Sequence, residues 1–327
     1  MTRLLVTRRI VARLGERMEA IAGMHGAPLQ YEFLPEDPAE RFPLDQLALI
    51  DAAFFSSDVF PERSRAFFAA VQGAPNLKWM HTFNAGTDNP VFGRIRDAGA
   101  RLTTSSGSTA VPIAQTAITG LLMLARGFPL WLESQRSREW QPRTDIPHDL
   151  AGQSMVVVGL GAIGMEIARL GQALGLHVSG VRRSPATGRE PVDALAHPDR
   201  LDDLLPACDW LALAAPLTPE TNRIIDRRRL ALLPHGAHIL NVGRGALIDE
   251  PAMIERLKSG ALAGAYLDVF EEEPLPPDSP LWSLPNVIVT PHNSSISTGN
   301  EARTWEYFLH NLDAWLGGTP MKNEVTG

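Results

Sequence analysis

Residues 155–164 read Met-Val-Val-Val-Gly-Leu-Gly-Ala-Ile-Gly, an apolar run that ends in three glycines. The apolar run predicts a buried strand, and the residues after it predict the start of a helix. Glycines at this spacing permit a tight turn, a close approach of the backbone to a pyrophosphate, and tight packing of helix against strand. The glycines are Gly159, Gly161 and Gly164, and the helix-start amides expected to meet phosphate charge are those of Ala162 and Ile163. The alternative, a glycine-rich turn without a ligand, does not explain why a strand precedes it and a helix follows.

The residue after the next strand, His177–Val181, selects the dinucleotide. An acidic residue there would accept hydrogen bonds from a ribose 2′-hydroxyl and favour NAD. This chain instead has Arg182, Arg183 and Ser184, which can bind a 2′-phosphate that a carboxylate would repel. The sequence therefore predicts a preference for NADP(H), with NAD(H) possible. Solvated surface arginines that express no preference are the alternative.

Short apolar runs alternate with amphipathic segments along the chain, which is typical of parallel sheets covered by helices. The predicted strands form two series: Leu4–Thr7, Leu29–Leu34, Ala52–Ser56, Lys78–Thr82 and Arg101–Thr103, then Ser154–Val158, His177–Val181, Trp210–Ala214, His238–Val242, Gly264–Val269 and Val287–Thr290. A long predicted helix, Ala110–Arg126, separates the two series of strands. A last predicted helix, Gly299–Leu316, has no strand after it. We therefore predict an α/β protein of two doubly wound parallel-sheet domains with an interdomain cleft. Residues 1–98 and 293–327 would form the flavodoxin-like substrate-binding domain, and 99–292 the dinucleotide-binding Rossmann domain.

Composition narrows the classes of function. The chain has 327 residues, with 37 acidic against 30 basic residues and a net charge of −7. The electrostatic field of this negative net charge would repel nucleic acid and anionic lipid, and no long basic run offsets it. The N-terminus lacks the apolar core of a signal peptide, and no apolar stretch is long enough to span a membrane. We therefore expect a cytoplasmic protein with neither a nucleic-acid nor a membrane partner. Its one cysteine, Cys208, is expected to be a small buried hydrophobe.

Three segments place polar residues just beyond predicted strands: 240–249 with Arg244, 267–274 with Glu273, and 289–293 with His292. Carboxyl ends of parallel strands share one edge, so these side chains are expected to converge near the dinucleotide turn. Arg244 can bind the carboxylate of a 2-keto acid and polarise its carbonyl. His292 can donate the proton needed when hydride reaches C2, and Glu273 would orient the imidazole and favour its protonated form. No metal is needed, and the histidines lack the spacing of metal ligands.

These segments, together with Ala215–Thr221 and Phe83–Asp88, resemble the D-2-hydroxyacid dehydrogenase family, particularly its glyoxylate/hydroxypyruvate reductase-like branch. The resemblance covers most of the chain. It implies an NADPH-preferring reductase of small 2-keto acids to D-2-hydroxy acids, with Arg244, Glu273 and His292 as the catalytic triad. It also implies a homodimer built on the cofactor domain, with Ala110–Arg126 and Trp131–Arg143 at the interface.

The same resemblance implies further contacts. Cofactor contacts are expected at Ala215, Pro216, Thr221, Val242, Gly243, Arg244, Asp268 and His292. Substrate contacts are expected at Ser57, Ala85, Gly86, Arg244 and His292, with backbone N–H groups around Ala85 and Gly86 holding the substrate carboxylate. Two positions depart from the family pattern. Gln115 stands where relatives often carry Glu, and Asn293-Ser294-Ser295 is more polar than the residues usual after the histidine.

Two other functions fit the same fold. One is a formate-dehydrogenase-like reaction, in which the histidine pairs with Gln; Glu273 favours the keto-acid reaction instead. The other is a nicotinamide-sensing binding protein similar to the C-terminal-binding-protein corepressors, whose output is the recruitment of a partner. The intact acid–base pair favours an enzyme.

Overall fold

The chain folds into two compact units in a computed structural model, which describes residues 1–87, 89–142 and 149–325. The first unit comprises Met1–Thr109 and Ser297–Gly327, and the second comprises Ala110–Ile296. These bounds differ from the predicted domain limits, because the strand at Arg101–Thr104 pairs within the first sheet and the chain through Ile296 stays with the second. Asp88 and Arg143, at the ends of two segments singled out above, lie outside the described residues.

The first unit has a five-stranded parallel sheet in the order β2-β1-β3-β4-β5. Its strands are β1 (Thr2–Val6), β2 (Leu29–Phe33), β3 (Ala52–Phe55), β4 (Trp79–Thr82) and β5 (Arg101–Thr104). Its helices are α1 (Arg8–Met24), α2 (Ser64–Gly73), α3 (Pro90–Asp97) and α10 (Asn300–Leu316). Alternate residues of each strand face opposite layers, so Leu4 packs with α1 and α10 while Leu5 packs with α2 and α3. The two faces of the sheet are thus both buried.

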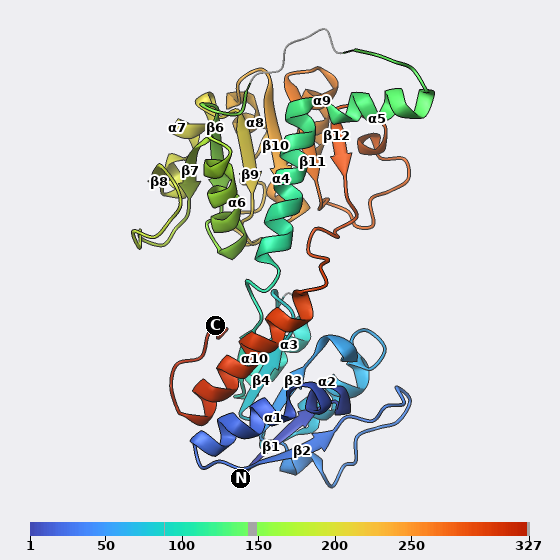
Figure 1. Cartoon of the computed structure of the whole chain (residues 1–327), viewed down its shortest axis with the longest axis vertical. Coiled ribbons are helices and arrows are strands. Elements are labelled where there is room, and N and C mark those ends of the chain that lie inside the picture. The colour runs from blue at the N-terminus through green and yellow to red at the C-terminus, as the bar shows by residue number, and fades with distance from the viewer. Residues whose placement is uncertain (88, 143–148, 326–327) are drawn as a thin grey trace. The chain divides into compact units, whose positions relative to one another are not determined.

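The second unit has a seven-stranded parallel sheet in the order β12-β11-β10-β9-β6-β7-β8. Its strands are β6 (Ser154–Val158), β7 (His177–Val181), β8 (Ala194–Ala196), β9 (Trp210–Leu213), β10 (Ala237–Asn241), β11 (Leu262–Leu267) and β12 (Val287–Val289). Its helices are α4 (Ala110–Arg126), α5 (Phe128–Ser137), α6 (Ala162–Ala173), α7 (Leu201–Leu204), α8 (Arg227–Leu232) and α9 (Glu250–Lys258). In Figure 1, α4 and α6 lie across the front of this sheet. Met155 and Val157 pack toward these two helices, whereas Val156 and Val158 face the opposite layer.

The predicted strands are all present, with ends that shift by at most two residues. The fold class is therefore confirmed. The short β8 was missed, because Ala194–Ala196 carries no β-branched or aromatic residue. In the described part of the chain, no single helix has the length and apolar composition of a membrane span, although α4 and α5, bent by 73°, reach that threshold as a pair.

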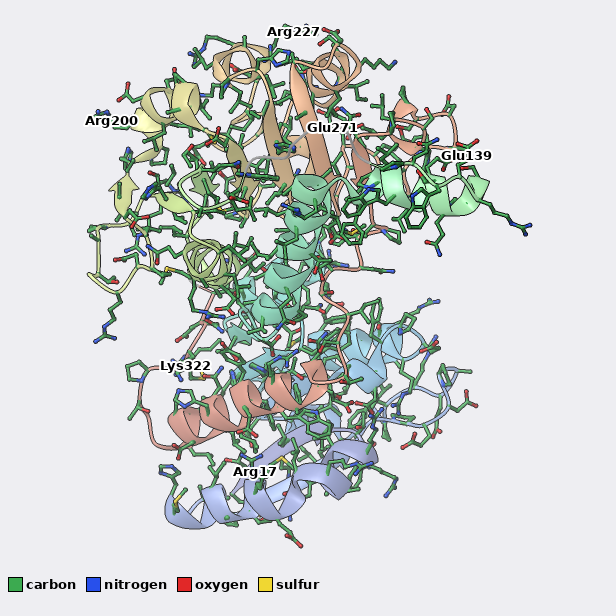
Figure 2. All side chains as sticks on the ribbon, turned by 45° about the horizontal axis from the view of Figure 1, so that its top comes forward. Arg17, Glu139, Arg200, Arg227, Glu271 and Lys322 are labelled. Atoms are coloured by element: carbon green, nitrogen blue, oxygen red, sulfur yellow. The ribbon has the colours of Figure 1, made fainter. Side chains whose placement is uncertain are left out.

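The C-terminal residues close the first unit. Phe308 of α10 stacks on Phe54 of β3, with 4.0 Å between ring centroids. Arg17 of α1 binds Glu306 of α10 at 2.7 Å (Figure 2). Beyond α10, Glu324 forms an antiparallel bridge with Thr103 and binds the guanidinium of Arg101 at 2.6 and 2.7 Å. The tail thereby covers the free edge of β5.

Candidate active site

The candidate residues of the second unit all follow the carboxyl ends of parallel strands. Arg244 comes after β10, Asp268 after β11 and His292 after β12, and these three strands are neighbours in the sheet. The glycine turn follows β6, and Arg182 follows β7. The edge shared by these loops is the one predicted from the sequence.

The glycine turn has the geometry of a phosphate cradle. Gly159 adopts φ +95°, and its N–H donates to Val181 O at 2.9 Å. A Cβ on Gly164 would lie 1.9 Å from Gly159 O, so only glycine lets α6 approach β6 this closely. A Cβ on Gly161 would meet no atom within 4 Å. Gly161 therefore leaves open space at the N-terminus of α6, as a bound pyrophosphate requires.

The two arginines after β7 have different surroundings. Arg182 is only 15% exposed and pairs with Glu190 at 2.8 Å, while its guanidinium also donates to the carbonyls of Ser184 and Pro185. Glu190 further accepts hydrogen bonds from Thr187 N and Oγ1 at 2.8 and 2.7 Å, and these hold its pKa at about 2. Arg183 is 65% exposed, with Glu220 at 3.9 Å. Sequence reasoning missed Glu190, because only the fold of the loop brings it back to Arg182.

Another predicted cofactor segment follows β9. Ala215 is buried, and a Cβ on Gly159 would meet its Cα at 2.5 Å, so the glycine turn packs directly on this loop. Thr221 Oγ1 donates to Pro216 O at 2.7 Å and accepts from Thr218 N at 2.7 Å. These bonds give residues 215–221 a defined conformation beside the turn.

His292 and Glu273 form a hydrogen-bonded pair. The distance from His292 Nδ1 to Glu273 Oε2 is 2.8 Å, and the side chains are 51% and 35% exposed. The second oxygen of Glu273 accepts from Phe270 N at 3.0 Å, which fixes the carboxylate from behind. Glu271, labelled in Figure 2, instead binds Arg223 at 3.4 Å. Among these acidic residues, Glu273 is therefore the partner of His292.

Arg244 lies in a loop held by its own backbone and by the neighbouring loop. Asn241 accepts from Gly243 N at 3.1 Å and donates to Arg244 O at 3.0 Å. The Arg244 guanidinium donates to Gly243 O at 2.7 Å. A Cβ on Gly245 would lie 1.8 Å from the Phe270 carbonyl carbon. The loops that carry Arg244 and Glu273 thus touch through their backbones.

Asp268 is buried, with 1% exposure, and its carboxylate faces the loop that carries His292. It accepts hydrogen bonds from Thr290 Oγ1 at 2.6 Å, from Asn293 N at 3.0 Å, and from Ser294. The sequence identified Asp268 as a cofactor contact; the structure shows contacts of its carboxylate with the protein itself. Val242, also predicted to contact cofactor, is buried at 6%.

The predicted substrate contacts of the first unit follow β3 and β4, which are adjacent. Ala85 and Gly86 are exposed directly beyond β4. Ser57 begins a short 3₁₀ turn after β3, and its hydroxyl donates to Glu301 at 3.2 Å. Glu301 in turn binds Arg9 at 2.7 Å. Ser57 is therefore already engaged by α10, a contact that spacing in the sequence does not reveal.

The thiol of Cys208 is a structural group of the core. Burial raises the pKa of the Cys208 thiol to about 12, which leaves it protonated and unreactive. Within residues 1–87, 89–142 and 149–325, no group of three or more His, Cys, Asp or Glu side chains is placed to hold a metal ion.

Comparison with known proteins adds an independent finding. Residues 118–294 match the sequence profile described as D-isomer specific 2-hydroxyacid dehydrogenase, NAD binding domain. The chain is 33% identical over 261 residues to a glyoxylate/hydroxypyruvate reductase B of Pectobacterium carotovorum, covering 78% of this chain and 81% of that protein. It is 34% identical over 257 residues to a D-3-phosphoglycerate dehydrogenase of Methanocaldococcus jannaschii, covering 78% of this chain. The match spans only about half of that relative, 48% of its length.

A comparison with solved structures indicates the same family. A D-isomer specific 2-hydroxyacid dehydrogenase from Xanthobacter autotrophicus, in complex with NADPH and MES, superposes with a TM-score of 0.75 at 30% identity, covering 99% of this chain and 98% of that one. The sequence-based recognition of the family, including its glyoxylate/hydroxypyruvate reductase relatives, is confirmed.

The glycine turn allows a matched pair of variants. Gly161→Ala should leave thermal stability unchanged, because the new methyl meets no protein atom, yet weaken NADPH and NADH binding by at least about tenfold by blocking the pyrophosphate. Gly164→Ala should instead lower the free energy of unfolding by about 1–3 kcal/mol, because its methyl clashes with Gly159 O. Thermal denaturation and fluorescence titration would measure both. Unaltered dinucleotide affinity in Gly161→Ala would place the pyrophosphate elsewhere.

Proposed function

Because the chain belongs to the D-isomer specific 2-hydroxyacid dehydrogenase family, we propose that it reduces a small 2-keto acid to the D-2-hydroxy acid, with NADPH preferred and His292 as proton donor. The observation that carries this proposal is the 2.8 Å contact between His292 Nδ1 and Glu273 Oε2, next to the loop of Arg244. Members of this family are oxidoreductases that act on 2-hydroxy acids. The proposal adds the substrate of this chain, its preferred cofactor and the roles of individual residues.

The imidazole is arranged to lose a proton from its outer nitrogen. A bound nicotinamide would supply hydride to C2 of the keto acid, and charge would then develop on the carbonyl oxygen. His292 donates the Nε2 proton to that oxygen, while its Nδ1 proton stays on the hydrogen bond to Glu273. The Glu273 carboxylate fixes the orientation of the imidazole ring throughout the reaction. A half-exposed histidine without such a partner would rotate freely.

Arg244 of the second unit is proposed to recognise the carboxylate of the substrate. A guanidinium can hold a carboxylate through two parallel hydrogen bonds and withdraw charge from the adjacent carbonyl. The exposed residues Ala85 and Gly86 carry backbone N–H donors, which can bind a carboxylate without a formal charge. Ser57, which follows the neighbouring strand, is a further proposed substrate contact.

The preference for NADPH rests chiefly on Arg183. Its guanidinium is 65% exposed at the end of β7, whereas the charge of Arg182 is already balanced by Glu190. No carboxylate occupies positions 182–184, where one would bind the ribose of NAD. The Xanthobacter relative binds NADPH, which is consistent with this assignment. NADH is the less favoured cofactor in this proposal.

A homodimer through the second unit is part of the proposal. Helix α5 exposes Phe128 by 42%, Leu130 by 48% and Trp131 by 38%, and Trp140 beyond it is 96% exposed. Large apolar side chains gathered in one segment are typical of a protein interface.

A panel of 2-keto acids tests the proposed reaction. Purified protein should oxidise NADPH with at least one of glyoxylate, hydroxypyruvate and phenylpyruvate, and chiral analysis should identify the D-2-hydroxy acid. The kcat/KM for NADPH should exceed that for NADH. Dinucleotide binding without turnover would support a sensor, and formate oxidation would support the formate-dehydrogenase-like reaction.

Removal of the proton donor gives the second test. His292→Ala should lower kcat by roughly 10²–10⁴-fold, because water must replace the positioned acid, while NADPH affinity stays nearly constant. Exposed His235 in the same unit serves as the control, and His235→Ala should keep wild-type turnover. Full activity in His292→Ala would remove this residue from the mechanism.

Variants of Arg182 and Arg183 test which of the two arginines sets the preference for NADPH. Arg183→Gln should raise the KM for NADPH by about ten- to a hundredfold, the range expected for loss of a charge-assisted hydrogen bond, and leave the KM for NADH unchanged. Arg182→Gln should have the smaller effect, because Glu190 already neutralises that guanidinium. Steady-state kinetics with both dinucleotides would decide, and a larger effect at Arg182 would contradict the assignment.

A further inference from the structure

His292 has a backbone conformation that most residues avoid. Its φ of +54° lies in the left-handed region, which costs a non-glycine residue roughly 1–2 kcal/mol. Such a conformation persists only where the surroundings impose it. The contacts around residue 292 therefore decide whether the imidazole reaches Glu273.

The buried carboxylate of Asp268 holds the chain on both sides of His292. Before it, Thr290 Oγ1 donates to Asp268 Oδ1 at 2.6 Å. After it, Asn293 N donates at 3.0 Å, Ser294 N at 3.1 Å, and the Ser294 hydroxyl binds the other oxygen. The N–H of His292 itself donates to the Asp268 carbonyl at 2.9 Å. One residue thus accepts hydrogen bonds from each of residues 290, 292, 293 and 294.

Ser294 connects this carboxylate to the rest of the second unit. It is 5% exposed, so its hydroxyl has little access to water and depends on Asp268 as its partner. Its carbonyl accepts from Thr116 Oγ1 of α4 at 3.3 Å. Two residues later, after Ile296, the chain leaves the second unit. Ser294 therefore fixes the segment that follows His292 from two directions.

We propose that Asp268 and Ser294 are positioning residues, which hold His292 in its left-handed conformation and so keep Nδ1 on Glu273. The proposal rests on the proposed role of His292 as proton donor. It gives the Asp268 carboxylate a task within the protein in addition to the cofactor contact predicted from the sequence. It also gives a physical role to the polar residue at 294, where the chain departs from the family pattern.

The structure supplies a matched control in Tyr266. Its hydroxyl lies 2.8 Å from Thr290 Oγ1, and Tyr266 itself is 1% exposed. Tyr266→Phe removes a buried hydroxyl from the same network, but every direct bond between Asp268 and the His292 loop remains. A role limited to stability would make Tyr266→Phe and Ser294→Ala behave alike.

The kinetic test compares these variants at saturating substrate. Ser294→Ala should lower kcat about tenfold and Asp268→Asn about a hundredfold, as expected when a catalytic group is misplaced by a fraction of an ångström to one ångström. For Ser294→Ala, the KM values for keto acid and NADPH should stay within about twofold, and the solvent deuterium isotope effect on kcat should rise because proton transfer slows. Ser294→Thr, which keeps the hydroxyl, should recover most of the rate, and Tyr266→Phe should retain it. Wild-type kcat in Ser294→Ala, or an equal loss in Tyr266→Phe, would overturn the proposal.

A spectroscopic measurement separates this inference from the proposed function. In ¹⁵N-histidine-labelled protein, the imidazole signal assigned by its absence in His292→Asn should show a hydrogen-bonded Nδ1 proton in the wild type and in Tyr266→Phe. That proton signal should be lost or broadened in Ser294→Ala. Its full retention there would contradict the role of Ser294. If the wild type reduced no 2-keto acid, the proposed function would fail, yet this signal would still decide whether Ser294 holds His292.

Discussion

The parallel direction of all strands in the second sheet is the constraint on which the candidate site depends. Residues far apart in the chain, such as Gly159, Arg244 and His292, each follow the carboxyl end of a strand. One sheet edge therefore receives the phosphate turn, a guanidinium and an imidazole without any of them being close in sequence. The glycines add a second requirement, because Gly164 and Gly245 permit backbone approaches that a side chain would prevent.

The sequence was sufficient for the architecture and for the partner of His292. Short apolar runs that alternate with amphipathic segments predicted every strand except β8, and the place of Glu273 beyond the strand at 264–269 predicted the glutamate that binds the imidazole. The state of Arg182 was not predictable, because its ion pair with Glu190 forms only when the loop after β7 folds back. The hydrogen bond from Ser57 to Glu301 joins residues that are distant in sequence, so no local pattern signals it. Such contacts depend on tertiary structure rather than on periodicity.

Exposure divides the polar groups near His292 into two kinds. The side chains of His292 and Glu273 are 51% and 35% exposed, which their proposed roles at a substrate require. Asp268 is 1% exposed and is surrounded by hydrogen-bond donors. In a buried setting such bonds are strong and their loss is costly, so the geometry there is rigid. The proposed proton donor, His292, and the proposed positioning residue, Asp268, therefore lie on two adjacent loops and differ in exposure.

The first unit is built from both ends of the chain, since α10 and the tail through Glu324 pack on strands formed by the first 104 residues. During synthesis on the ribosome, the second unit emerges complete while the first still lacks its last helix and the cover on β5. An uncovered sheet edge is a template for pairing with another chain. A chain that stopped before residue 300 would therefore lack α10 and leave the edge of β5 uncovered, and its first unit would be prone to pairing with another chain.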